Sequence, residues 1–321
     1  MDMNGVICTD HMIDSGVDGL RVLLRNKHRD PGNGQVGTPI LFVHGATYAS
    51  TITFDYAVGG VSWMDWMADR GFDVWAIDLP GYGGSERPAA MAGDPAGVDP
   101  LIRTADAETA TGRAIDFILA HRSLPRLHLA GYSWGTSISG GVAAARPDVI
   151  DRLVLYGVLW CREQPTGIAA SGMPGAWRHV TADAIVQRWC TGLTDDQAAS
   201  VATPAAMRAW ADAAVESDPD PMATGTRGLR APAGVIRDVL EYWVQGRPTW
   251  DPARIKAPTL VVVGERDQET KPDQGLQVFG LLEQAPEKRI TLIGGATHSM
   301  LLETGRHALY STVLDFLRPQ A

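Results

Sequence analysis

A serine flanked by glycines carries the clearest chemical signal in this chain. The sequence Gly131-Tyr132-Ser133-Trp134-Gly135 follows an apolar run and precedes a segment rich in small residues. The two glycines allow a tight turn from strand to helix without a Cβ clash, so the Ser133 hydroxyl would stand above the edge of a sheet. The N–H groups at the start of the helix would lie free beside it. This context predicts that Ser133 is a catalytic nucleophile.

A serine hydroxyl needs a general base, because it is a weak nucleophile at neutral pH. Among the eight histidines, His298 lies in the loop between the last apolar run and the last helical segment, at the sheet edge expected for Ser133. His44 is the strongest rival, since it ends an earlier strand and precedes Gly45. We expect His298 to be the base.

The base in turn needs a carboxylate that orients its ring. Two acidic residues follow the apolar run 261–263, namely Glu265 and Asp267. Asp267 lies further past the strand end and can reach across to the histidine loop. Glu265 is the alternative, and it could equally pair with Arg266. We therefore expect Asp267 to complete a Ser-His-Asp triad.

A tetrahedral intermediate requires hydrogen-bond donors for its oxyanion. The backbone N–H of Trp134, the residue after the nucleophile, is one candidate. The second is the backbone N–H of Ala46, because Gly45 permits an unusual backbone angle after the strand 40–43. The alternative for this second segment is a plain turn at a strand end.

The surrounding pattern predicts an α/β fold, because short apolar runs alternate with helical segments. Such alternation implies right-handed crossovers and a mostly parallel, doubly wound sheet with helices on both faces. The expected strands are 39–43, 72–77, 126–130, 152–156, 259–263 and 289–293, and the expected helices are 62–70, 105–121, 136–145 and 306–317.

One long segment interrupts this alternation. From about 158 to 250 we find no strand-like run, and prolines separate helix-like pieces. We predict a core domain in two parts, 1–157 and 251–321, with a helical cap at 158–250. The cap would hold six of the ten tryptophans, most of which we expect to serve packing: Trp160, Trp177, Trp189, Trp210, Trp243 and Trp250.

Composition narrows the class of protein. The chain has 321 residues, 45% of them hydrophobic, and a net charge of −9. An acidic chain is a poor general binder of nucleic acid or anionic membranes. Three cysteines without metal-ligand spacing argue against a disulfide-built secreted domain. We see neither a signal peptide nor an apolar run that could span a bilayer, so we expect a cytoplasmic protein. No motif indicates a metal ion or an organic cofactor, so we expect an enzyme that uses neither. The oligomeric state stays open.

These motifs together resemble the α/β-hydrolase superfamily. Beside the serine turn, His44-Gly45-Ala46, Asp78-Leu79-Pro80-Gly81-Tyr82-Gly83-Gly84-Ser85, Gly264-Glu265-Arg266-Asp267 and Gly295-Ala296-Thr297-His298 occur in the family's order. The resemblance implies the α/β-hydrolase fold, the chain order nucleophile, acid and base, and a helical cap at the insertion. It also implies that Asp78 belongs to a structural turn.

The resemblance leaves the substrate open. Serine at the turn differs from the Asp of haloalkane dehalogenases and epoxide hydrolases. The segment 47–64 is similar to bacterial hydrolases of xenobiotic esters, including monoalkyl phthalate hydrolases, which implies a small-molecule ester substrate. The alternatives are an amidase or prolyl-iminopeptidase-like aminopeptidase, an acyltransferase, and a ligand receptor on the same fold. An aminopeptidase would need an acidic cluster in the cap, for which Asp212, Glu216, Asp218 and Asp220 are candidates.

A cap arginine could bind the free carboxylate of an aromatic monoester, because the planar guanidinium accepts a carboxylate through two hydrogen bonds. Most cap arginines should instead lie on the solvated surface. The candidates are Arg162, Arg178, Arg188, Arg208, Arg227, Arg230, Arg237 and Arg247.

Overall fold

The computed structural model describes residues 5–30, 36–165, 167–170 and 172–318. An eight-stranded sheet forms the centre, with the strand order β1-β2-β4-β3-β5-β6-β9-β10. The strands from β4 to β10 in this order pair in parallel, whereas β1 and β2 pair antiparallel at one edge. The predicted α/β-hydrolase fold, with a mostly parallel doubly wound sheet, is confirmed. The strands are β1 Val6–Asp14, β2 Arg21–Arg29, β3 Pro39–Val43, β4 Asp73–Ile77, β5 Leu127–Tyr132, β6 Ile150–Tyr156, β9 Thr259–Gly264 and β10 Lys288–Ile293.

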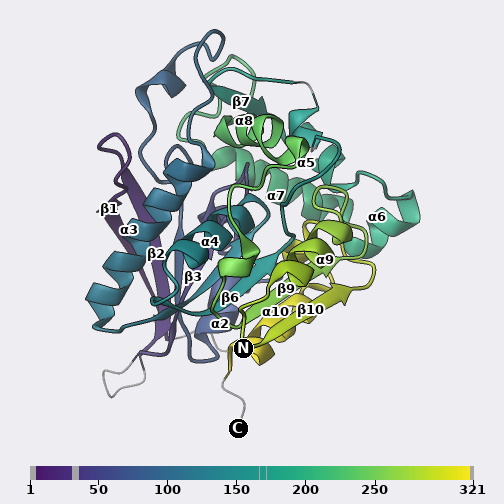
Figure 1. Ribbon diagram of the computed structural model, residues 1–321. Coiled ribbons are helices and arrows are strands. Elements are labelled where there is room, and N and C mark those ends of the chain that lie inside the picture. The colour runs from purple at the N-terminus through teal and green to yellow at the C-terminus, as the bar shows by residue number, and fades with distance from the viewer. Residues whose placement is uncertain (1–4, 31–35, 166, 171, 319–321) are drawn as a thin grey trace.

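Helices connect these strands and cover the sheet (Figure 1). All residues of β3, β4 and β5 are buried, which explains why these strands appear in the sequence as continuous apolar runs. The helices are α1 Ser50–Thr53, α2 Trp63–Ala68, α3 Thr104–Arg122, α4 Trp134–Ala145, α5 Ala182–Trp189, α6 Asp195–Val201, α7 Pro204–Glu216, α8 Gly234–Glu241, α9 Pro272–Leu281 and α10 Arg306–Leu317.

The strand order determines where the segments after β3 and β5 meet. β3 pairs with β4 on one side and with β5 on the other, so the chain runs from β3 to β4 in one direction and then returns past β3 to β5 in the other. In open α/β sheets such a reversal creates a crevice at the carboxyl ends of the strands, where ligands bind. The segment after β3 carries Gly45 and Ala46, and Ser133 follows β5 directly. The fold therefore brings the two predicted oxyanion segments to one crevice.

The segment between β6 and β9 differs from its prediction in one respect. It contains α5 to α8, which lie together at one end of the molecule, in the upper part of Figure 1. It also contains two short antiparallel strands, β7 Trp177–Val180 and β8 Leu229–Pro232, so the expectation of a strand-free segment was wrong. Four-residue strands with polar residues and a proline produce no apolar run, which is why the sequence pattern missed them. In the described part of the chain, no helix has both the length and the apolar character needed to cross a membrane.

Candidate active site

Ser133 occupies the turn between β5 and α4 in a strained conformation. Its backbone has φ 56° and ψ −122°, which non-glycine residues rarely adopt. A Cβ atom on Gly131 would lie 2.2 Å from the carbonyl oxygen of Gly135, so the glycines allow the strand and helix to approach this closely. Backbone hydrogen bonds from Ser133 N to Tyr156 O and from Thr136 N to Ser133 O hold the turn. The strained turn presents the hydroxyl at the sheet edge.

An unbroken chain of hydrogen bonds joins three of the predicted residues. Ser133 Oγ lies 2.9 Å from His298 Nε2, and His298 Nδ1 lies 2.7 Å from Asp267 Oδ2. Asp267 is fully buried, and Ser133 and His298 are nearly so. Glu265 is exposed and accepts a hydrogen bond from Gly295 N at 2.6 Å. Of the two acidic candidates, Asp267 is therefore the one that contacts the histidine ring.

The Asp267 carboxylate is surrounded by donors that sequence reasoning missed. The backbone N–H groups of Glu269 and Thr270 donate to Oδ1 at 2.9 and 2.8 Å. The Thr270 hydroxyl donates to Oδ2 at 2.8 Å and lies 3.2 Å from His298 Nδ1. These donors satisfy the oxygens of the buried carboxyl group and fix its orientation. The sequence contained one indication of this contact, because Thr270 follows Asp267 by three residues in the loop after the predicted strand 259–263.

Two tyrosines bind the backbone of the loop that carries His298. The hydroxyl groups of Tyr132 and Tyr156 both donate to the carbonyl oxygen of His298, at 3.1 and 2.5 Å. The rings stack on each other with centroids 4.7 Å apart. The last residues of β5 and β6 thereby hold the backbone of the residue whose ring contacts Ser133.

His44, the rival histidine, has a structural environment. Its Nε2 accepts a hydrogen bond from Leu79 N at 3.0 Å, so in the neutral ring Nδ1 carries the proton and donates to Gly45 O at 2.7 Å. Burial lowers the pKa of His44 to about 4. Since the Gly45 carbonyl is bound by His44, the N–H of Ala46 in the same planar peptide points the opposite way.

The two segments that carry the predicted oxyanion donors both lie close to Ser133. A Cβ on Gly45 would come within 2.9 Å of Ser133 Cβ, so the Gly45–Ala46 segment passes close to the serine. Trp134 N is at the first position of α4, where helical N–H groups lack an intrahelical acceptor. The Ala46 carbonyl accepts hydrogen bonds from Tyr82 Oη at 3.1 Å and from Arg178 at 2.7 Å. The chain around Ala46 is thus fixed by side chains from both the core and the inserted segment.

A pocket opens at Ser133 and His298. The core contributes the segment after β3, including Ala46 and Tyr48, and the loops after β9 and β10. The inserted segment contributes a wall that includes two indole rings, from α5, α7 and the residues after α5: Ile185, Arg188, Trp189, Thr191 and Trp210. All six tryptophans of the insertion are buried, as expected, and two of them line the pocket.

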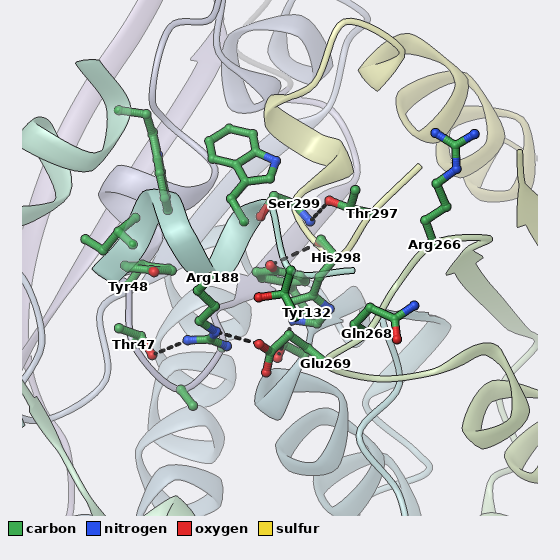
Figure 2. Close-up of a pocket in the computed structure, with 17 residues that line it drawn as sticks. Thr47, Tyr48, Tyr132, Arg188, Arg266, Gln268, Glu269, Thr297, His298 and Ser299 are labelled. Carbon is green, nitrogen blue, oxygen red and sulfur yellow. Dashed lines mark hydrogen bonds and ion pairs between the residues drawn. The ribbon is translucent and has the colours of Figure 1, made fainter. Parts of the chain in front are cut away.

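Of the arginines in the inserted segment, Arg188 enters the pocket. It lies between Thr47 and Glu269 (Figure 2), donating to Glu269 Oε1 at 2.8 Å and to Thr47 Oγ1 at 3.2 Å. Burial alone would raise the pKa of Glu269, but the charge and hydrogen bond of Arg188 outweigh it, and the pKa falls below its usual range. The pocket therefore holds an ion pair beside the serine.

The remaining polar groups of the insertion mostly pair with each other. Arg208 and Arg227 bind Asp212, and Arg227 also binds Glu216, all at the surface. Asp218 binds Arg230 at 2.7 Å. Three of the four acidic candidates are thus paired with arginines, and none of the four lines the pocket at Ser133. Within the part of the chain that the structure describes, no group of three or more His, Cys, Asp or Glu side chains is arranged to hold a metal ion.

Comparisons with known proteins agree with this architecture. No curated protein sequence matches the chain. A solved serine hydrolase involved in carbazole degradation is 17% identical, with a TM-score of 0.66 over 97% of this chain and 99% of the other. The 2-hydroxy-6-oxo-6-phenylhexa-2,4-dienoate hydrolase from Rhodococcus sp. strain RHA1 is 16% identical, with a TM-score of 0.67 over 98% and 100%. A thermophilic esterase from Thermogutta terrifontis is 15% identical, with a TM-score of 0.61 over 97% and 98%.

At these identities the structural likeness establishes the fold alone. The sequence profile described as "alpha/beta hydrolase fold" matches residues 38–304, which include Ser133, Asp267 and His298. That range covers most of the chain and every strand from β3 to β10. The protein belongs to the α/β-hydrolase family.

Proposed function

We propose that this protein is a serine hydrolase that cleaves a carboxylic ester through an acyl-enzyme intermediate. The observation that carries the proposal is the continuous hydrogen-bonded chain from Ser133 through His298 to Asp267, with the serine held at a strained turn. In this proposal the three residues form the catalytic triad, and residues 158–250 form the cap that closes the pocket over it.

Each residue has a defined role. His298 Nε2 accepts the hydroxyl proton while Ser133 Oγ attacks the acyl carbon. Asp267 holds the ring with Nδ1–H directed at Oδ2 and stabilises the imidazolium. The N–H groups of Ala46 and Trp134 form the oxyanion hole. His298 then passes its proton to the leaving alcohol, and water activated by the same ring releases the acid.

The pocket supports a monoester of an aromatic acid, such as a monoalkyl phthalate, as the substrate class. Trp189, Trp210 and Tyr48 provide flat apolar walls for a ring. Arg188 provides a cation near Ser133, although Glu269 already occupies part of its donor set. A substrate carboxylate would therefore share Arg188 with Glu269. The aminopeptidase alternative loses support, because none of the four acidic candidates lines the pocket and three of them are paired with arginines.

The experiment combines hydrolysis with labelling. Purified protein is assayed on short alkyl esters, charged monoesters and aryl amides, and the Ser133→Ala variant is assayed in parallel. We expect ester hydrolysis that Ser133→Ala abolishes without a change in thermal unfolding. A fluorophosphonate should label Ser133, as located by mass spectrometry of the digested protein. A folded Ser133→Ala protein with near wild-type turnover contradicts the mechanism. Ester turnover far below one per minute on every substrate supports the receptor alternative instead.

A further inference from the structure

Two tryptophans separate the active-site pocket from a second cavity. Trp189 ends α5 and Trp210 lies in α7, and both line the pocket that contains Ser133. The same two side chains also line a second cavity, which is partly open to solvent. Apart from the tyrosine hydroxyl, the other side chains that line it are apolar: Tyr56, Ala57, Val58, Gly59, Ala206 and Leu302.

The two indoles form a fixed wall. Their ring centroids lie 5.5 Å apart at an interplanar angle of 85°, and the rings are 6% and 3% exposed. Trp210 Nε1 donates to Ile52 O at 3.0 Å, and Trp189 Nε1 lies 3.3 Å from Glu303 Oε1. The Tyr48 ring packs edge-on against Trp210 at 4.7 Å. Because each indole is both packed and hydrogen-bonded, moving one aside would cost both kinds of contact.

We infer that the Trp189–Trp210 wall limits the length of the apolar group that the pocket accepts beside Ser133. This inference rests on the proposed ester hydrolase function. A linear alkyl group that extends from the reacting ester meets the indoles before it can reach the second cavity. Removing one indole would join the two spaces, and the apolar lining beyond the wall would then accept further methylene groups. The wall thus selects short or compact esters over long-chain esters.

Trp210→Ala is the direct test. Trp210 is preferred to Trp189, because Trp189 contacts Glu303, which also binds Thr297 beside His298. The value of kcat/KM is measured for 4-nitrophenyl esters from butanoate to decanoate and for alkyl benzoates from butyl to decyl. The two series distinguish an acyl chain from an alcohol chain at the wall. Burying one methylene favours binding about fourfold. In one of the two series, we therefore expect the ratio of kcat/KM for the eight-carbon chain to kcat/KM for the four-carbon chain to rise at least tenfold in the variant.

Two controls make the result specific, and a substitute variant is available. Trp177→Ala removes a buried cap tryptophan that packs in a separate cluster with Met91, and should leave the chain-length ratio unchanged. Adding Ala206→Phe to Trp210→Ala refills the second cavity and should remove the gain. Trp210→Leu replaces the alanine variant if thermal unfolding shows that the latter does not fold.

A binding measurement keeps this test separate from the proposed function. The affinities of 1-butanol and 1-octanol for wild type and Trp210→Ala are measured by calorimetry, which requires no turnover. The inference predicts that the variant gains affinity for octanol over butanol. If no ester is hydrolysed, the proposed function fails while the alcohol affinities still decide this inference. An unchanged chain-length ratio, or an unchanged alcohol preference, in a folded variant overturns it.

Discussion

Thr270 binds Asp267 through both its backbone and its side chain. Its N–H donates to Asp267 Oδ1 and its hydroxyl to Oδ2, each at 2.8 Å. The hydroxyl oxygen also lies 3.2 Å from His298 Nδ1, on the side of the ring that faces the carboxylate. Thr270 is therefore a positioning residue, which acts on the Ser133–His298 contact by holding the carboxylate that orients the ring.

Replacing Thr270 by Val should lower turnover while preserving the side-chain shape. The substitution removes one hydrogen bond to a buried carboxylate, an interaction of about 1.5 to 3 kcal/mol. We expect kcat to fall on the order of tenfold, with KM little changed, because the hydroxyl does not touch the substrate pocket. Thr270→Ser keeps the hydroxyl and should retain near wild-type kcat. Equal losses in the Val and Ser variants would show that packing, not the hydroxyl, is what matters.

Asp267→Asn should cost far more than Glu265→Gln. The amide keeps the shape of Asp267 but cannot hold the imidazole with Nδ1–H directed at it and stabilise its positive charge. By analogy with other triads, turnover should fall up to ~10⁴-fold. Glu265 is exposed and contacts the Gly295 backbone, so its amide variant should change turnover little. Steady-state kinetics on one ester decides this, and the reverse order of effects would reassign the triad acid.

The parts of the fold that could be predicted are those whose sequence pattern lies within one short segment. Parallel strands buried on both faces appear as apolar runs, and the turn residues at their carboxyl ends follow at once, as at Ser133 and Asp267. The edge strands β1 and β2 escaped prediction, because β1 is mostly exposed and β2 consists largely of charged and polar residues, so neither forms a continuous apolar run. The two strands inside the insertion, β7 and β8, were missed because each has only four residues.

Within the site, the partners of each side chain could not be predicted. Eight cap arginines look alike in sequence, and the structure alone places Arg188 between Thr47 and Glu269. One helical signal was available, since Ile185, Arg188 and Trp189 are three and four residues apart and share a helix face. The ion pair of Arg188 depends on Glu269, which lies in a loop more than eighty residues away in sequence. No pattern within a short segment could predict it.

Glu108→Gln should make unfolding less dependent on pH. Glu108 lies on α3, and a Cβ on Gly141 of α4 would lie 1.9 Å from its Oε1, so the carboxyl group packs between the helices. Burial, assisted by the charge of Asp238, raises the pKa of Glu108 from 4.5 to about 7. Between these values the folded protein retains a proton that the unfolded chain has released. Wild-type stability should therefore fall as pH rises through this window, by at most about 3 kcal/mol.

The glutamine variant lacks this titration. Its free energy of unfolding relative to wild type should increase from pH 4 to pH 8, as measured by urea unfolding at several pH values. Glu283→Gln, at an exposed position, is the matched control and should follow the wild-type curve. Parallel curves for Glu108→Gln and wild type would contradict the buried-carboxyl interpretation.

The Arg188–Glu269 pair provides the sharpest test of the substrate class. If Arg188 binds a substrate carboxylate, a monoalkyl phthalate should have a higher kcat/KM than its dialkyl counterpart. One charge-assisted hydrogen bond of about 1.5 to 3 kcal/mol corresponds to roughly 10- to 150-fold. Arg188→Gln should abolish the preference. Glu269→Gln should increase it, because Arg188 then loses the carboxylate that competes with the substrate.

The two variants must therefore move the monoester-to-diester ratio in opposite directions. The double variant Arg188→Gln/Glu269→Gln leaves neither an unpaired cation nor an unpaired carboxylate, and it should behave as Arg188→Gln alone. Added salt should reduce the wild-type preference only partly, since a desolvated ion pair is weakly screened. A wild-type preference for the diester, or a ratio that neither single variant alters, would remove the carboxylate-binding role of Arg188 while leaving the serine esterase proposal intact.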